Sequence, residues 1–326
     1  IYKQLCNPLT QHSNLAEVMT KEKEIVKSEI DERNANHGWV TYYALLDIIL
    51  EKSNPLLSTI LGTDETLQNI SEHDLEKIGS DVFVSENLTI TVMNHGKKDL
   101  ALLVREALLE LFQSYPRSKK IHKLDWPALD KIKKIKPTES VVYKKTALKN
   151  GICSVVFCWI IDFNEFSSEE FGLKRFLHFL NEKVHKYSRN NGLAYSAGAY
   201  SIYGETKQFV IIRFDVSKKR AEDLVIILKQ LKKDLPYIMN FSSDELRSII
   251  EIEQKRERVV PLSSETRLSW MIYGLQRHQK LVNADRVKEQ YKQITENHIS
   301  QWGSYFTKNQ GFTMVVGDIE EPVSSS

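Results

Sequence analysis

Cysteine is scarce in this sequence of 326 residues, which contains only Cys6, Cys153 and Cys158. Three cysteines without a C-x-x-C pair exclude a disulfide framework and a cysteine-based metal or redox motif. Cys153 and Cys158 stand inside an apolar run, where a free cysteine behaves as a small hydrophobic residue. We therefore expect a reducing compartment and a cytoplasmic location.

The sequence also lacks an excess of either charge and any long hydrophobic run. Its 45 basic and 43 acidic residues give a net charge of +2, which removes any whole-molecule argument for binding nucleic acid or an anionic membrane. The longest strongly apolar run covers residues 152–161, whereas a membrane span needs about 20 residues. This run therefore predicts a buried strand, and we expect no membrane span. A 41% apolar composition excludes intrinsic disorder as the main state.

Hydrophobic periodicity predicts a chain of α+β class, in which hairpin-like strands precede groups of helices. Predicted helices cover residues 14–35, 40–50, 56–61, 71–78, 99–113, 167–187, 217–234, 242–258, 265–280, 284–292 and 295–302. Predicted strands cover residues 88–94, 140–146, 152–162, 193–203, 207–215 and 312–317. Within this pattern, the apolar strand 209–216 leads to Ser217, which we interpret as the N-cap of a helix over 218–232.

A proline-containing basic run divides the chain. Residues 114–137 include Pro116, Pro127 and Pro137, and their lysines and arginines far outnumber the two aspartates. We interpret the run as a solvated linker between a first lobe at 1–113 and a second lobe at 138–326. The alternative is a patch that binds an anionic polymer, although two aromatic residues are too few for a stacking platform.

The two lobes share a repeated pattern. Residues 70–92 align with residues 294–316 without a gap at an offset of 224, and each copy predicts a capped helix, a turn at glycine and a strand. The identical pairs are Ile70/Ile294, Glu72/Glu296, Gly79/Gly303, Ser80/Ser304, Thr89/Thr313 and Val92/Val316. A chance match is the alternative, but a pattern shared over about 23 positions favours duplication.

The same offset predicts that the first lobe is incomplete at its N-terminus. Ile1 corresponds to residue 225, whereas the second copy begins near Thr138. We therefore expect the equivalent of about 87 residues, containing a strand, a helix and a strand pair, to precede Ile1. The architecture implied is a duplicated pair of lobes, each a mainly antiparallel sheet packed with helices.

The first predicted helix places two carboxylates among apolar residues. Glu22 and Glu29 are seven residues apart, two turns along one face, on the apolar stripe formed by Leu15, Val18, Met19, Ile25, Val26 and Ile30. Ionised carboxylates on a buried stripe are costly unless they are paired or bound to metal. The alternative is that both lie at the edge of the stripe, reach solvent, or pair with Lys23 or Arg33.

Several segments resemble the pitrilysin/insulinase-type metallopeptidases, also called inverzincins. The first helix resembles the family helix that carries the last zinc ligand, and similar segments follow in order across nearly the whole chain. They are Asn54–Thr63, the "I-S-x-x-D-L" helix at Ile70–Leu75, the strand Leu88–Val92, the "G-L-A-Y-S" turn at Gly192–Ser196, the strand Phe209–Val216 and the "A-E-D-L" segment at Ala221–Leu224. The family fold is likewise a duplicated α+β lobe.

The resemblance assigns roles to four residues. It implies that Glu29 is the zinc ligand and that Glu22 supports the metal site. It also implies that Tyr195 and an arginine seven residues before it bind the substrate backbone and oxyanion. Ser188 stands at that spacing, so we assign the role to Arg189, one residue later. The alternative for Tyr195 is a half-buried strand tyrosine.

The family's H-x-x-E-H motif is absent from the sequence. None of the nine histidines stands in it or in H-E-x-x-H, although a catalytic zinc site needs about three protein ligands. Zinc is therefore expected only if a preceding segment or a partner supplies the histidines. Whether this chain is itself part of an enzyme stays open.

The resemblance implies a subunit or fragment of a zinc metallopeptidase that processes peptides inside a clamshell chamber. The expected partners are a peptide substrate and a second family half, which is a homodimer mate, a heterodimer mate or the rest of a longer chain. The main alternative is a non-catalytic half that binds peptide and completes the chamber. A weaker alternative is a binding module that uses the basic run to bind an anionic polymer. Nucleic acid is not among the expected partners.

Overall fold

The computed structural model describes residues 15–52, 54–82, 84, 98–114, 141–146, 151–162, 167–203, 207–217, 223–259, 263–278, 281–309 and 311–318. They belong to two compact units. The first unit draws on residues 1–32, 59–125 and 262–284, and the second on residues 33–58, 126–261 and 285–326. No helix among the described residues is long and apolar enough to cross a membrane.

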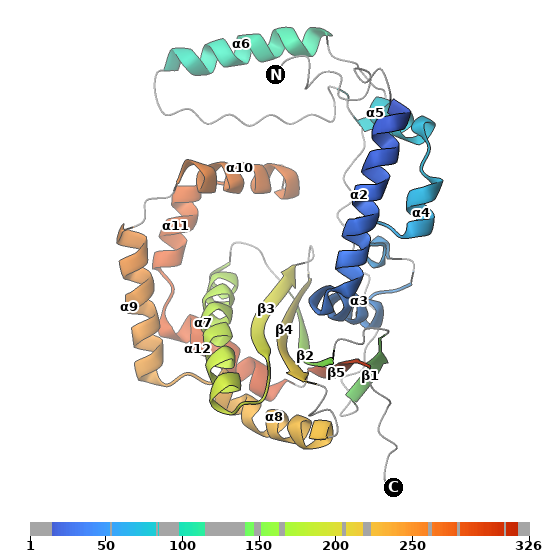
Figure 1. Ribbon diagram of the computed structural model, residues 1–326. Coiled ribbons are helices and arrows are strands. Elements are labelled where there is room, and N and C mark those ends of the chain that lie inside the picture. The colour runs from blue at the N-terminus through green and yellow to red at the C-terminus, as the bar shows by residue number, and fades with distance from the viewer. Residues whose placement is uncertain are drawn as a thin grey trace. The chain divides into compact units, whose positions relative to one another are not determined.

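The first unit is helical where it is described. It contains most of α2 (Leu15–Ala35), together with α4 (Asp64–Asn69), α5 (Glu72–Val82), α6 (Lys98–Ser114) and α10 (Ser264–His278). Helices α2 and α4 lie side by side (Figure 1). Lys23 of α2 joins them, because its Nζ donates to the carbonyl oxygens of Gln68 at 3.0 Å and Ile70 at 2.6 Å. A cation at the C-terminal end of a helix also complements the helix dipole.

The second unit is built around a five-stranded sheet. Its strands are β1 (Val141–Lys145), β2 (Ile152–Asp162), β3 (Ser196–Tyr203), β4 (Lys207–Ser217) and β5 (Phe312–Gly317). They run in the order β1-β5-β2-β4-β3, and only the β1–β5 pair is parallel. The structure thus confirms the α+β class and the mainly antiparallel sheet.

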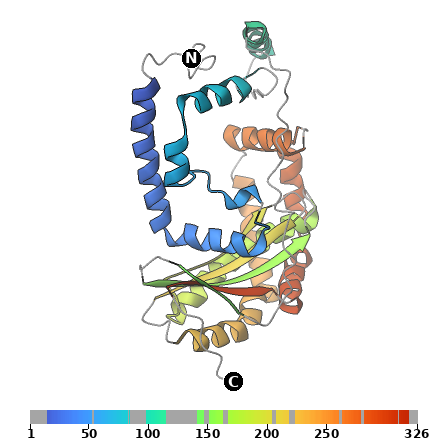
Figure 2. The same cartoon turned by 90° about the vertical axis from the view of Figure 1, so that its right-hand side faces the viewer.

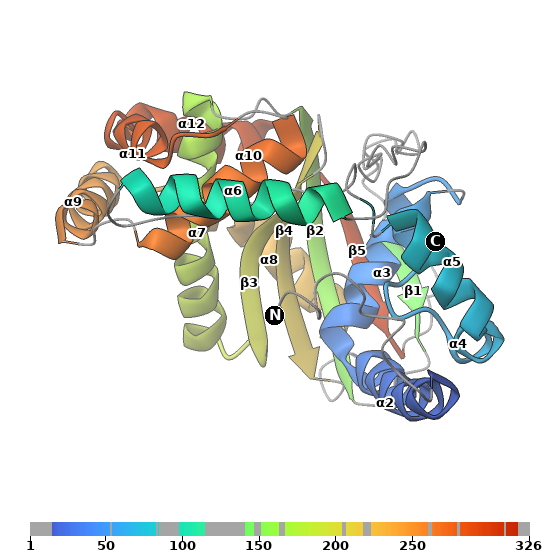
Figure 3. The same ribbon diagram turned by 90° about the horizontal axis from the view of Figure 1, so that it is seen from above.

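Helices cover both faces of this sheet (Figures 2 and 3). On one face α3 (His37–Ile49), followed by a short 3-10 turn at Pro55–Leu57, packs its buried leucines and isoleucine against residues of β2, β4 and β5. On the other face lie α7 (Ser168–Asn190), α8 (Leu224–Met239) and α12 (Glu296–Lys308). Coverage on both sides explains why β2 is an almost continuous apolar run. Along the chain, α9 (Ser243–Val259), α10 and α11 (Ala284–Lys292) stand between α8 and α12.

The predicted start of the helix that follows β4 is wrong. Ser217 is the last residue of β4, where it pairs with Ile152, and α8 begins only at Leu224. The strand is longer than predicted because it pairs with β2 along its whole length. Helix α8 also continues through Pro236 to Met239, since the buried side chains of Ile238 and Met239 extend its apolar stripe. The predicted strand 88–94 and residues 115–137 of the basic run lie outside the described residues.

The repeated segments have the same type of helix cap. In α5 the Ser71 backbone N–H donates to Asp74 Oδ2 at 2.8 Å, and in α12 the Thr295 N–H donates to His298 Nδ1 at 3.1 Å. These pairs stand at the predicted offset of 224. The equivalence of the strands that follow, and with it the division into lobes at 1–113, 114–137 and 138–326, stays a prediction.

The glycine shared by the two copies does not form the predicted turn. Gly79 and Gly303 lie inside α5 and α12, which continue to Val82 and Lys308. A Cβ at Gly303 would lie 2.4 Å from the carbonyl oxygen of Met239. This glycine therefore allows α12 to pack closely against α8 instead of ending the helix.

Candidate functional site

The side chains of α2 form two adjacent stripes. Met19, Lys23, Val26 and Ile30 are buried or half-buried, whereas Glu22 and Glu29 are exposed. Their apolar neighbours Val18 and Ile25 are also 36% and 43% exposed. The prediction that both glutamates share a buried stripe is therefore wrong for this structure, because residues 18, 22, 25 and 29 form a separate, exposed stripe.

The two carboxylates lie on one face of α2, but the described residues do not surround either of them with further ligands. Among the described residues, no group of three or more His, Cys, Asp or Glu side chains could hold a metal ion. An ion pair between Lys23 and Glu22 or Glu29 was the alternative. The Lys23 ammonium group instead binds the carbonyl groups at the end of α4. The role of Glu29 as a zinc ligand stays a prediction.

The second pair of predicted site residues flanks the turn between α7 and β3. Gly192 has φ +54°, a left-handed conformation that ends α7, and its N–H donates to the Arg189 carbonyl at 3.1 Å. The N–H of Leu193 donates to the Ser188 carbonyl at 3.1 Å. Ser188 itself is buried, so the position at the family's arginine spacing faces inward, whereas Arg189 is exposed.

Tyr195 lies at the other end of the turn, just before β3. Its side chain is 86% exposed, and its backbone N–H donates to the Asp215 carbonyl at 2.7 Å. The alternative of a half-buried strand tyrosine is therefore wrong. The structure places Arg189 and Tyr195 on one exposed turn, in the second unit, whereas Glu22 and Glu29 belong to the first.

Asp215 anchors a buried polar cluster beside this turn. Ser154 Oγ donates to Asp215 Oδ1 at 2.5 Å, and Arg213 Nη2 donates to Asp215 Oδ2 at 2.6 Å. Ser154 Oγ also accepts from Thr41 Oγ1 at 3.1 Å and lies 2.8 Å from His37 Nε2. Because His37 and Thr41 belong to α3, the cluster ties that helix to β2 and β4.

The cluster contains Ser, His and Asp, but its connections do not form a nucleophilic triad. In a triad the histidine stands between the serine and the carboxylate. Here Ser154 stands between His37 and Asp215, donates its hydrogen bond directly to the carboxylate, and is fully buried. The network assigns the His37 proton to Nε2, while the buried Nδ1 has no hydrogen-bond partner. The cluster therefore holds structure in place and does not attack a substrate.

Burial gives His37 a titration that affects stability. Its pKa is lowered from 6.5, mainly by desolvation and also by Arg213, while Asp215 opposes the shift. Well above pH 6.5 His37 is neutral in both the folded and the unfolded state, so the lowered pKa costs no stability there. As the pH falls below 6.5, the unfolded state takes up the proton first and stability decreases, until the pH passes the lowered pKa of the folded state.

We expect His37→Gln to reduce the decrease in the free energy of unfolding as the pH falls below 6.5. In the natural chain, one proton can lower this free energy by at most about 1.4 kcal/mol per pH unit. Urea unfolding measures the difference between the two chains at pH values from about 7.5 to about 5, in steps of about 0.5 units. This range brackets the ordinary pKa of histidine. His185→Gln, at an exposed position of α7, is the matched control and should leave the curve unchanged. Equal effects of the two substitutions would contradict the assignment.

This cluster was not predicted from the sequence, although the sequence contains a signal for it. Ser154 and Asp215 are polar residues with apolar neighbours on both sides in β2 and β4, and the sheet register pairs them directly. A polar residue at a buried strand position requires a hydrogen-bond partner. That requirement predicts a polar contact for each residue, but only the register identifies the partner.

Comparison with known proteins places the fold. No protein-family model and no curated protein matches the sequence. A solved peptidase M16 inactive domain from Pseudomonas fluorescens has a TM-score of 0.72 at 12% identity, over 98% of this chain and 75% of that chain. The periplasmic protease PqqL from Escherichia coli has a TM-score of 0.66 at 12% identity, over 98% of this chain and 34% of that chain. A chain of complex III2 from Candida albicans, with Inz-5 bound, has a TM-score of 0.67 at 13% identity, over 99% and 78%.

These structural similarities identify the class of fold. The chain has the fold of the M16, or pitrilysin-type, peptidases, a class in which inactive domains also occur. It spans about a third of the length of PqqL and about three quarters of the other two chains. The fold predicted from the sequence resemblance is thereby confirmed.

Proposed function

We propose that this chain is a subunit or fragment of a pitrilysin-type zinc metallopeptidase that processes peptides inside a clamshell chamber. The observation that carries the proposal is the exposed turn with Arg189 and Tyr195, on a chain with the M16 fold. The turn is held by backbone hydrogen bonds to α7 and β4, and the buried cluster fixes Asp215 beside it. An exposed donor on a rigid turn suits contact with an extended peptide.

In this role the two side chains bind the peptide backbone. The Tyr195 hydroxyl donates a hydrogen bond to a carbonyl oxygen, and this bond strengthens as negative charge develops there. The Arg189 guanidinium adds a charge-assisted donor for the same backbone. Neither residue needs to lose a proton, so both orient substrate and stabilise charge without acting as bases.

The described residues do not by themselves fit a zinc ion. Glu29 offers one carboxylate, and the described part of the chain shows no cluster of three possible ligands. The proposal therefore assigns Glu29 as one ligand and requires histidines from a preceding segment or a partner half. Glu22, two turns earlier on the same exposed stripe, would support the site.

We expect Glu29→Gln to remove zinc from the intact assembly, because one anionic ligand is lost. Metal content measured by mass spectrometry of the purified assembly checks this. Glu22→Gln should lower zinc affinity more mildly, by about 10–100-fold, as a supporting residue does. Glu24→Gln, an exposed glutamate outside the stripe, is the matched control and should retain zinc. Equal zinc content in the Glu29 and Glu24 variants would contradict the ligand role.

The second candidate function is a non-catalytic half that binds peptide and completes the chamber. It is favoured by the similarity to a structure described as an inactive domain and to a chain of complex III2. In that case Glu29→Gln leaves the zinc content of the assembly unchanged, whereas substitutions at Tyr195 still weaken peptide binding. The two candidates therefore differ in a single metal measurement.

The proposal includes a partner and a location. A second family half, from another chain or from the rest of a longer one, faces the turn with Arg189 and Tyr195 across the chamber.

We keep the cytoplasm as the proposed location, since the buried cysteines Cys153 and Cys158 are free thiols. One similar structure is described as a periplasmic protease, so fractionation of cells tests this part directly.

A further inference from the structure

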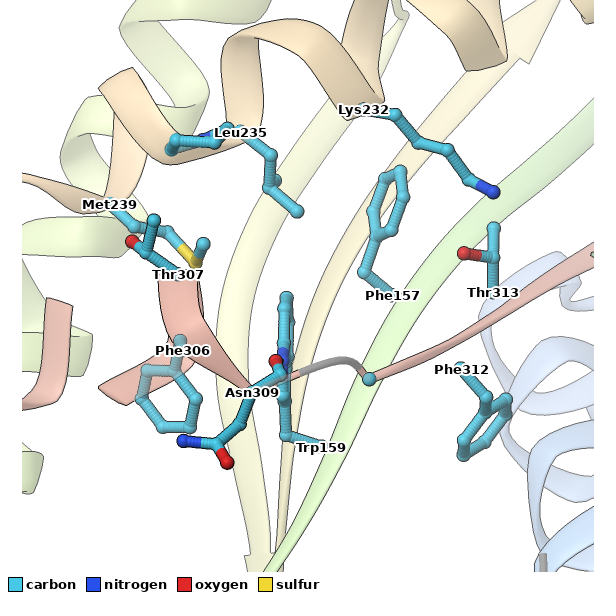
Figure 4. A pocket seen from close by; sticks show the side chains of 12 residues that line it. Phe157, Trp159, Lys232, Leu235, Met239, Phe306, Thr307, Asn309, Phe312 and Thr313 are labelled. Carbon is cyan, nitrogen blue, oxygen red and sulfur yellow. The ribbon is translucent and has the colours of Figure 1, made fainter. Parts of the chain in front are cut away.

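A small pocket opens in the second unit, and none of its lining residues belongs to the turn with Arg189 and Tyr195. It lies between α8, β2 and the connection from α12 to β5, and has a volume of about 180 Å³ (Figure 4). An engineered apolar cavity of about 150 Å³ binds benzene, whereas drug-sized ligands occupy about 300–1,000 Å³. The pocket therefore has room for one aromatic ring or a branched aliphatic group.

The inner wall of the pocket is apolar and already formed. Its buried side chains are Phe157, Trp159, Leu235, Met239 and Phe306. The Trp159 indole is fixed, because its Nε1 donates to the Asn309 carbonyl at 2.9 Å and its ring lies 5.3 Å from that of Phe306. Gly311 lies flat against it, since a Cβ there would come within 2.9 Å of the indole. A wall held in this way loses little entropy when a ligand binds.

The polar groups of the pocket favour an anion. Lys232 is exposed and so marks the mouth, while Thr313 supplies a hydroxyl on the inner side. Figure 4 shows the Lys232 ammonium group extending toward the side of Phe157 and Thr313. The donors of Thr307 and Asn309 are already used within α12, where they bind the carbonyl groups of Gly303 and Tyr305. None of the twelve described residues that line the pocket is acidic.

We propose that this pocket binds a compact apolar carboxylate, with the ring or branched chain against Trp159 and the carboxylate beside Lys232. A free aromatic or branched acid and the C-terminal residue of a peptide share this chemistry. The proposal does not depend on the peptidase function, because the pocket and the turn with Tyr195 have no residue in common.

Fluorine NMR of the chain labelled with 5-fluorotryptophan tests the proposal. Titration with 3-phenylpropanoate should shift the Trp159 resonance, identified by its loss in Trp159→Phe, and leave Trp39 and Trp270 unchanged. For a ligand of this size we expect half-saturation at about 1 mM. The neutral amide 3-phenylpropanamide should bind about fivefold more weakly, as expected for one partly exposed ion pair. No saturable shift of Trp159 up to about 20 mM, or equal binding of acid and amide, would overturn the proposal.

Two substitutions locate the ligand. Lys232→Met keeps the aliphatic stem and should reduce the affinity for the acid to that for the amide. Lys233→Met, one residue later and outside the pocket lining, is the control and should change nothing. Leu235→Phe should fill the pocket and abolish binding of both ligands; if this variant does not fold, competition between toluene and 3-phenylpropanoate provides the same test. Equal effects of the two lysine substitutions, or no competition by toluene, would contradict the site.

The source of the carboxylate is distinguished with peptides. If the site takes peptide C-termini, acetyl-Ala-Ala-Phe should shift Trp159 and its C-terminal amide should do so more weakly. If the site takes only free acids, the peptide should have no effect while 3-phenylpropanoate still binds. Both results support the pocket and assign its source.

Discussion

Replacing Tyr195 with phenylalanine is expected to lower the turnover of the intact assembly by about 10²–10³-fold. The change removes only the hydroxyl group, which the account assigns to the oxygen that develops negative charge during peptide cleavage. The ring is 86% exposed and the backbone N–H, which the substitution retains, binds the Asp215 carbonyl. The structure of the turn and the assembly of the protein should therefore be unaffected. Hydrolysis of an unfolded, fluorescence-quenched peptide measures the effect.

Tyr237 provides a matched control for this prediction. It is 75% exposed and lies on α8, outside the α7–β3 turn. Tyr237→Phe should change turnover by less than about twofold, as surface substitutions usually do. If Tyr195→Phe changed turnover no more than this control does, the hydroxyl would have no part in catalysis.

Replacing Asp215 with alanine is expected to lower the free energy of unfolding by about 3–5 kcal/mol. The carboxylate is 5% exposed and accepts hydrogen bonds from both Ser154 and Arg213. Its removal leaves the guanidinium of Arg213 without this partner and the buried hydroxyl of Ser154 without its acceptor. Chemical denaturation of the purified chain measures the loss.

Asp162 is the matched control for this second prediction. Its side chain is 88% exposed and forms an ion pair with Lys207 at the other end of the same two strands. Asp162→Ala should cost less than about 1 kcal/mol, because solvent screens exposed ion pairs. A similar loss for the two aspartates would show that burial of the cluster does not determine its contribution.

Local sequence patterns predicted most of the fold in the second unit. Strand β2 has the predicted bounds, 152–162, because the apolar and β-branched residues of this run are typical of a strand buried on both faces. The boundary between β4 and α8 was misplaced because strand pairing with β2, which joins residues far apart in sequence, extends the strand to Ser217. The capping preference of Ser217 is a local signal and contains no information about this pairing.

The candidate site was predictable only in part. A residue-by-residue resemblance proposed Tyr195 and Arg189 as site residues, and the structure shows that both lie on one exposed turn. Helical spacing alone could not separate the stripe that contains Glu22 and Glu29 from the adjacent buried one, because both include apolar residues. The pocket beside Trp159 was not predictable, since it arises from the packing of α8 and α12 on the sheet.

Photo-cross-linking from position 195 tests the central claim that this turn contacts peptide. A p-benzoyl-L-phenylalanine residue at position 195 of the intact assembly, irradiated with an unfolded peptide, reports contact whether or not the half is catalytic. We expect a strong cross-link that excess unlabelled peptide abolishes, and little cross-linking when the same residue stands at position 237. Equal yields from positions 195 and 237, or none from position 195, would contradict it.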